Sequence, residues 1–128
     1  SKKRKTDEKY YAENCKDLTK EIQTKNNGKV FCFFSGLEII PPVHYHQLKK
    51  RIGEFYTDKE WLVPALDDYH LAWHGGNLEW LLKQDWYTKV FLPNLKAKSQ
   101  ELYDKEIARR DKVNKLNPPK LFNDEEEL

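Results

Sequence analysis

The sequence predicts a small α+β domain, in which a short extended region is followed by helices. Two observations favour this class: residues 30–48 are extended in character and contain two prolines, and histidines at helical spacing follow in "HLAWH" at 70–74. A chain of 128 residues fits one domain. Its 13% aromatic content supplies large core side chains, which argues against disorder over residues 30–107.

The N-terminal part, residues 1–29, is expected to be a basic tail followed by a helix. The opening "SKKRK" is typical of a solvated tail, with a nuclear-localisation or nucleic-acid-binding arm as the alternative. A weakly amphipathic helix is expected over residues 7–25, and the turn-forming "KNNG" ends it.

The extended region begins with "VFCFF" at 30–34, an aromatic and β-branched run that predicts a buried strand. Pro41 and Pro42 then exclude a helix, so the chain is expected to turn and return extended towards His46. A further short extended segment is expected at 61–66.

A helix is expected from about residue 68, capped by Asp67 or Asp68 and stopped by the two glycines of "HGG". A second short helix fits "NLEWLLKQ", and a last one is expected from about residue 93 to 113. Pairs of opposite charge at i, i+4 spacing, Glu101–Lys105 and Glu106–Arg110, support the last helix. The domain would therefore cover residues 30–116, with an acidic tail at 117–128.

Charge and cysteine content narrow the class of protein. The net charge of +2 combines basic clusters with an acidic end, which permits contact with nucleic acid without requiring it. Cys15 and Cys32 are too few for a thiolate cluster and favour a reduced, cytoplasmic setting. No signal peptide and no apolar run long enough to span a membrane is apparent, so no membrane association is expected.

The four histidines fall into two pairs with the spacing of metal ligands. His70 and His74 share one helix face, and His44 and His46 share one strand face. A strand that carries one pair, beside a helix that carries the other, could close a site with three or four nitrogen ligands. The spacing predicts a shared metal ion but does not choose the metal or its role.

The order of these motifs resembles the ββα-metal finger of HNH endonucleases, and most of all the branch that contains phage recombination endonucleases. The chain has "CFFSG", "HQLKKRIGE", "DKEWLVPAL", "HLAWHGG" and then "DWYTKVFLPNLKAKSQELYDKEIARR" in the family's order, over about residues 30–110. The resemblance implies a small HNH-like finger with additional N- and C-terminal helices, in an intracellular protein of a phage or bacterium.

The resemblance also assigns roles to individual residues. It implies that His46, His70 and His74 bind one divalent ion (Mg, Mn, Ni or Zn). It places Gln47 at the position of the general base, where the family has histidine, and a glutamine amide cannot accept a proton from water near neutral pH.

Three explanations of Gln47 stay open. The chain is an inactive form, or His44 supplies the base, or the loop carries one extra residue and His46 is itself the base. The first two are favoured, because three protein ligands are more usual at a catalytic metal.

A second departure is Ser35, which stands where the family often has a second cysteine. No structural cysteine-bound zinc is therefore expected, and aromatic side chains must stabilise the finger instead. The candidates for this core are Phe31, Phe33, Phe34, Trp61, Trp73 and Trp80.

The resemblance implies metal-assisted hydrolysis of DNA phosphodiester bonds, with low sequence specificity or with specificity for DNA structure. Lys49, Lys50 and Arg51 follow the ligand strand and could bind phosphates of double-stranded or branched DNA, although a solvated loop is the alternative. Cuts on both strands would need two active sites and so a homodimer. The rival interpretation is a DNA-binding or assembly module that keeps the metal but has no catalytic activity.

Overall fold

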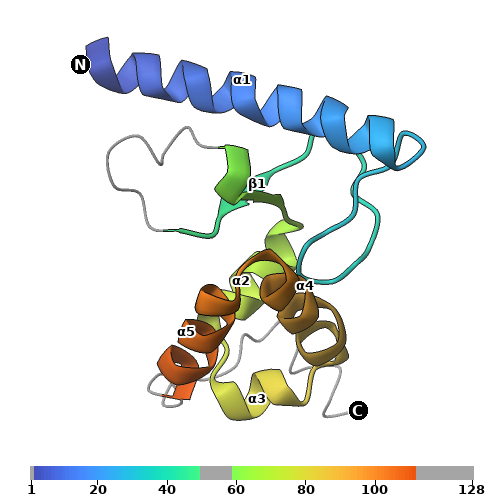
Figure 1. The fold of residues 1–128 in the computed structure, drawn as a ribbon, viewed down its shortest axis with the longest axis vertical. Coiled ribbons are helices and arrows are strands. Elements are labelled where there is room, and N and C mark those ends of the chain that lie inside the picture. The colour runs from blue at the N-terminus through green and yellow to red at the C-terminus, as the bar shows by residue number, and fades with distance from the viewer. Residues whose placement is uncertain (1, 50–58, 112–128) are drawn as a thin grey trace. The chain divides into compact units, whose positions relative to one another are not determined.

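The computed structural model describes residues 2–49 and 59–111. Within these ranges it contains helices and a two-stranded antiparallel sheet, so the predicted α+β class is confirmed (Figure 1). Contacts along the chain define two compact units. The first unit contains the described residues of Ser1–Cys32 and Leu37–Ala65, and the second contains those of Phe33–Gly36 and Leu66–Leu128.

The first unit begins with helix α1, Lys2–Lys25. This helix starts earlier than the predicted residue 7 and includes most of the stretch expected to be a tail, since lysine and arginine are good helix formers. It ends as expected at "KNNG", where Asn27 and Gly28 adopt left-handed backbone angles (φ 54° and 81°). The N–H of Gly28 donates to the carbonyl of Gln23 at 2.7 Å and closes the helix end.

The sheet of the first unit pairs β1 (Tyr45–Gln47) with β2 (Leu62–Pro64) in antiparallel register. A short 3-10 turn, η2 (Lys59–Trp61), precedes β2. The predicted extended segment at 61–66 is thus confirmed as a strand. Leu62 and Val63 are buried, and they anchor the sheet in the core of this unit.

The predicted strand at 30–34 is wrong, because these residues do not form a continuous strand. Phe31 makes only an isolated antiparallel bridge with Glu38, and the chain turns at residues 33–36. Side chains still alternate: Val30 and Cys32 are buried, whereas Phe31 is 43% exposed. The apolar run correctly indicated burial, but a run of five residues does not specify whether a neighbouring strand is available along its whole length.

Side chains of α1 fix the position of β1. The hydroxyl of Tyr11 donates to the carbonyl of Tyr45 at 3.1 Å, and the hydroxyl oxygens of Thr19 and Tyr45 lie 2.6 Å apart. Further along the helix, Lys59 forms an ion pair with Glu21 at 3.0 Å. Helix α1 therefore holds the strand that carries His46.

The second unit contains the predicted helices α2 (Asp67–Gly75) and α3 (Leu78–Leu82). The side chain of Asn77 caps α3, since its Oδ1 accepts the N–H of Trp80 at 2.8 Å. The predicted aspartate cap of α2 is wrong: the N-cap is Leu66, which has no side-chain cap, and the two aspartates lie inside the first turn.

The last predicted helix is divided in two. A π-helical segment, η3 (Trp86–Phe91), continues into α4 (Leu92–Lys98), and α5 (Gln100–Asp111) follows and lies beside α4. Ser99 separates them with extended backbone angles (φ −163°, ψ 113°). Its hydroxyl accepts the N–H of Leu102 at 3.2 Å, so Ser99 begins α5 as a cap.

Aromatic side chains form the core of the second unit. Phe34 is fully buried and stacks on Phe91 at a centroid distance of 4.8 Å, and Phe91 also contacts Tyr87. Of the predicted core aromatics, Phe34 and Trp80 are buried, three are half-buried, and Phe31 is wrong because it is exposed. The half-buried ones are Phe33, Trp61 and Trp73.

Candidate metal centre

Helix α2 carries two of the candidate ligands. His70 and His74 lie one turn apart on the same face, with ring centroids 4.7 Å from each other. Asp67 and Asp68 in the first turn complement the positive end of the helix dipole. The helix ends at Gly76, whose N–H donates to the carbonyl of Ala72 at 2.9 Å.

Glycine is required at the end of α2 by close packing. Gly76 is buried, and a Cβ atom there would lie 2.7 Å from the indole ring of Trp80 and 2.9 Å from the carbonyl oxygen of Ala72. Both distances are shorter than any ordinary carbon contact. The glycine after "HLAWHG" therefore allows α3 to pack directly against the end of the ligand helix.

Strand β1 carries the third candidate. His46 is at the centre of the strand, opposite Val63 of β2. The pairing continues beyond the strand ends: Ala65 N–H donates to His44 O at 2.9 Å, and Leu48 N–H donates to Trp61 O at 2.8 Å. His46 is therefore held by backbone hydrogen bonds on both sides.

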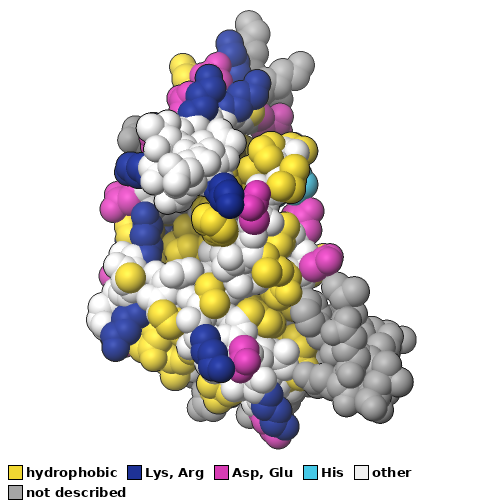
Figure 2. Space-filling view, turned by 90° about the vertical axis from the view of Figure 1, so that its right-hand side faces the viewer, with side chains coloured by type: hydrophobic (Ala, Val, Ile, Leu, Met, Phe, Trp, Pro, Cys, Tyr) yellow, Lys and Arg dark blue, Asp and Glu magenta, His cyan; other side chains and the backbone are white. Residues whose placement is uncertain are grey.

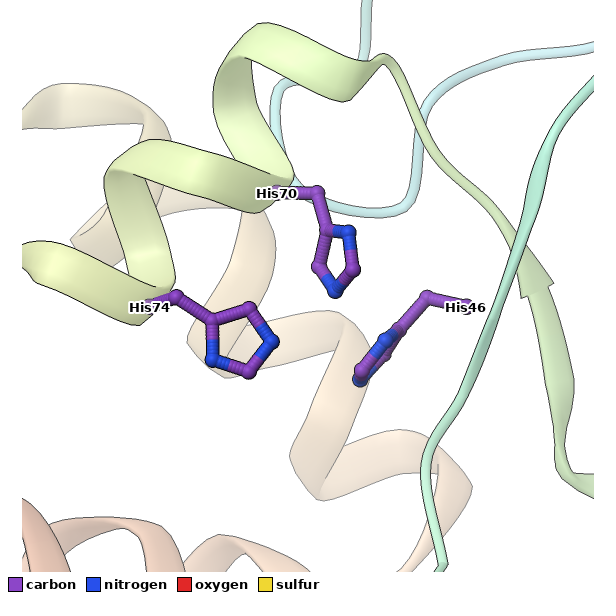
Figure 3. Close-up of side chains that lie close together, drawn as sticks. All are labelled: His46, His70 and His74. Atoms are coloured by element: carbon purple, nitrogen blue, oxygen red, sulfur yellow. The ribbon is translucent and has the colours of Figure 1, made fainter.

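The three imidazoles of His46, His70 and His74 converge, as Figure 3 shows. One ring nitrogen from each lies within 4.8 Å of the corresponding nitrogens of the other two. Nitrogens that bind one zinc ion at about 2.0–2.1 Å are separated by at most about 4.2 Å. These three residues are thus a group that could hold one metal ion.

The electrostatics of α2 favour the neutral imidazoles that bind metals. Partial burial lowers the pKa of His70, and the neighbouring His74 lowers it further, against the opposing effect of Asp67. Partial burial also lowers the pKa of His74, and the charges of Arg110 and Arg109 add to this. Neutral imidazole is the coordinating form, so both side chains are prepared for metal binding.

Aromatic rings surround the histidine pair within the second unit. The ring of Phe34 lies 5.8 Å from His70, and the indole of Trp73 lies 4.8 Å from His74 between centroids. These rings limit the rotamers that the imidazoles can adopt. They also restrict access of water to His70, which explains the direction of its pKa shift.

The other residues predicted from the sequence have different positions. His44 is exposed and is not a member of the histidine group found in the described part of the chain. Alternation along β1 puts Gln47 on the face that carries Tyr45, opposite His46. The ammonium of Lys49 lies 3.9 Å from the ring centre of Trp61. Lys50 and Arg51 lie outside the described residues.

The sequence did not lead us to predict that one charged pair beside the site is buried. Glu106 and Arg110 were expected to support the last helix as a pair at i, i+4 spacing, and each is only 6% exposed. Their position could have been noticed, because Leu102, Glu106 and Arg110 follow at intervals of four and so share one face of the helix. The apolar residue on this face indicates the buried side.

Comparisons with protein-family models, with characterised proteins and with solved structures found no match. Cys15 and Cys32, both within the described residues, form no disulfide. In the part of the chain that the structure describes, no helix combines the length and the apolar character needed to cross a membrane.

Proposed function

We propose that this protein is a metal-dependent DNA endonuclease of the HNH type, in which His46, His70 and His74 hold one divalent ion. The convergence of the three ring nitrogens within 4.8 Å carries the proposal. Three imidazoles leave at least one coordination position for water or phosphate, which is the composition of a catalytic rather than a closed structural site. Imidazole ligands favour zinc or nickel over magnesium, and manganese is the intermediate choice.

The nuclease class is supported by the order of elements along the chain. The sequence runs from β1 to β2 and then to α2, with one ligand on the first strand and two on the helix. This is the order expected of a ββα-metal finger. A divalent ion bound there would stabilise negative charge on the scissile phosphate and on the leaving oxygen.

The choice of general base follows from the faces of β1. Gln47 is on the opposite face from His46, and its amide cannot accept a proton near neutral pH. His44 precedes the strand by one residue, and its carbonyl continues the ladder to Ala65, so it shares the face of His46. We propose His44 as the residue that activates water, unless the chain is catalytically inactive.

DNA contact is proposed through the basic residues that follow β1. On the face in Figure 2, Lys and Arg side chains are interspersed with acidic and apolar ones and do not gather into one broad patch. We propose a limited set of phosphate contacts, made by Lys49 and by its sequence neighbours Lys50 and Arg51. Such contacts favour double-stranded or branched DNA without base-specific recognition.

The second candidate function is a DNA-binding or assembly module that keeps the metal without catalysis. Gln47 is the observation that favours it, because the position assigned to the base by the family resemblance has no proton acceptor. A homodimer is compatible with both functions.

The metal site is tested by titration of zinc and nickel into the wild type and into three single variants, His46→Ala, His70→Ala and His74→Ala. Each should lose most of its affinity, because two imidazoles bind far more weakly than three. His44→Ala is the matched control and should bind as the wild type does. Equal affinity in all five proteins would refute the site.

Catalysis is tested by nicking of a supercoiled plasmid with magnesium, manganese, nickel or zinc. The wild type should nick DNA, His44→Ala should bind metal but lose activity, and His74→Ala should lose both. Activity that appears only in Gln47→His would identify an inactive nuclease. Absence of activity in every protein, with DNA binding retained, would favour the module.

A further inference from the structure

A buried charged network lies beside the ligand helix, within the second unit. The carboxylate of Glu106 receives three donors: Trp73 Nε1 at 3.0 Å, the hydroxyl of Tyr87 at 3.3 Å and Arg110 Nη2 at 3.4 Å. Burial and the charge of Glu106 raise the pKa of Tyr87 above its usual value, so its hydroxyl stays protonated and continues to donate.

The network contacts α2 on both sides of one ligand. Trp73, the residue before His74, donates to Glu106, and the carbonyl oxygen of Gly76, two residues after His74, accepts from Arg110 Nη1 at 3.0 Å. The guanidinium of Arg110 also lies 4.9 Å from the ring centre of Trp73. The last turn of the ligand helix is therefore held at two points by α5.

We propose that Glu106 and Arg110 are positioning residues that orient the last turn of α2, and with it the imidazole of His74, for metal binding. This inference rests on the metal site proposed above. Neither residue belongs to the histidine group; both act through the indole of Trp73 and the backbone of Gly76. Outer-shell hydrogen bonds of this kind determine the orientation of metal ligands and, when removed, reduce metal affinity by about 10–100-fold.

The chemistry of the pair supports orientation rather than stability as its role. A buried ion pair gives little more stability than apolar residues of the same volume, because both charges lose their hydration. Directional hydrogen bonds, by contrast, fix the angle of the indole and the position of the Gly76 carbonyl. The cationic Arg110 at the end of α2 also complements the negative end of the helix dipole.

The experiment separates these two roles with an apolar replacement. In the double variant Glu106→Leu/Arg110→Met, the two side chains keep much of their volume but lose the hydrogen bonds. The matched control is Glu101→Leu/Lys105→Met on the same helix, where an exposed pair has the same spacing and a distance of 2.8 Å. Three quantities are measured for each protein. They are the stability of the metal-free form in urea, the affinity for zinc, and the visible absorption spectrum of the cobalt-bound form.

We expect the apolar double variant to fold with stability close to that of the wild type, to bind zinc about tenfold or more weakly, and to change the cobalt spectrum. The control should keep wild-type affinity and spectrum. Glu106→Gln, which is isosteric, should also fold and bind zinc more weakly, and it decides the question if the double variant does not fold.

Two results would count against different parts of the argument. If the wild type binds no metal, the metal site itself is refuted. If the wild type binds metal and Glu106→Gln binds it equally well, with the same cobalt spectrum, the metal site stands and the positioning role of Glu106 and Arg110 is wrong.

Discussion

His70 and His74 show how two side chains one turn apart affect each other before any metal is bound. His70 is half-buried and His74 is exposed, and a charge on His74 disfavours a charge on His70. Acidification must therefore protonate two imidazoles whose pKa values are lowered. A metal ion bound at both side chains would require neutral imidazoles, which the lowered pKa values favour.

The stability of the metal-free protein should fall on acidification. The pKa values of both histidines are lowered from 6.5 by folding, so the unfolded chain binds protons first. The stabilising contribution is complete above about pH 6.5 and is lost as the pH falls towards the lowered pKa values. Urea unfolding from about pH 8 to about pH 5 should show this slope. The slope should become shallower in the double variant His70→Ala/His74→Ala, and an unchanged slope would show that these two side chains do not cause it.

The candidate metal ligands could be identified from the spacing of the histidines, but the buried residues that contact their helix could not. Spacing of four places His70 and His74 on one face whatever the surroundings are. The same spacing in Glu106 and Arg110 was correctly taken as a pair, yet the burial of this pair depends on Trp73 and Tyr87 from other helices. Local spacing does not contain that information.

At the scale of elements, the boundary between α2 and α3 followed local signals, whereas the pairing of the strands did not. Helices α2 and α3 end or begin at Gly76 and Asn77, residues with strong local preferences. Strand β1 instead pairs with β2, which lies 17 residues ahead in the register His46↔Val63. Pairing across such a distance depends on the fold and not on local sequence. For the same reason, the apolar run at 30–34 did not predict whether a strand pairs with it.

The break at Ser99 was missed because serine is neutral within a helix and neither glycine nor proline accompanies it. Ser99→Ala should destabilise the protein by about 1 kcal/mol, because the N–H of Leu102 loses its acceptor. Ser99→Asp should retain the cap and remain close to the wild type. Urea unfolding of the three proteins measures the difference, and equal stability of Ser99→Ala would show that the cap contributes nothing.

At the scale of the whole molecule, metal binding and folding should be coupled. The proposed ligands come from a strand and a helix, so the unfolded chain would not hold them together. Zinc at 100 times its dissociation constant should raise the free energy of unfolding by about 2.7 kcal/mol. The increase is measured by urea unfolding with and without zinc. His44→Ala should keep the increase, and an equal increase in His74→Ala would place the bound ion elsewhere.

Trp73 lies next to both proposed helix ligands, so its fluorescence should report metal binding at them. Its indole lies 6.2 Å from His70 and 4.8 Å from His74 between ring centroids. Paramagnetic ions such as nickel or cobalt at the histidines should quench emission from this indole, whereas zinc should change it far less. At metal concentrations that saturate both proteins, Trp73→Phe, which leaves the three other tryptophans of the chain, should show far less quenching. Tryptophan fluorescence can then report the occupancy of the proposed site without an added label.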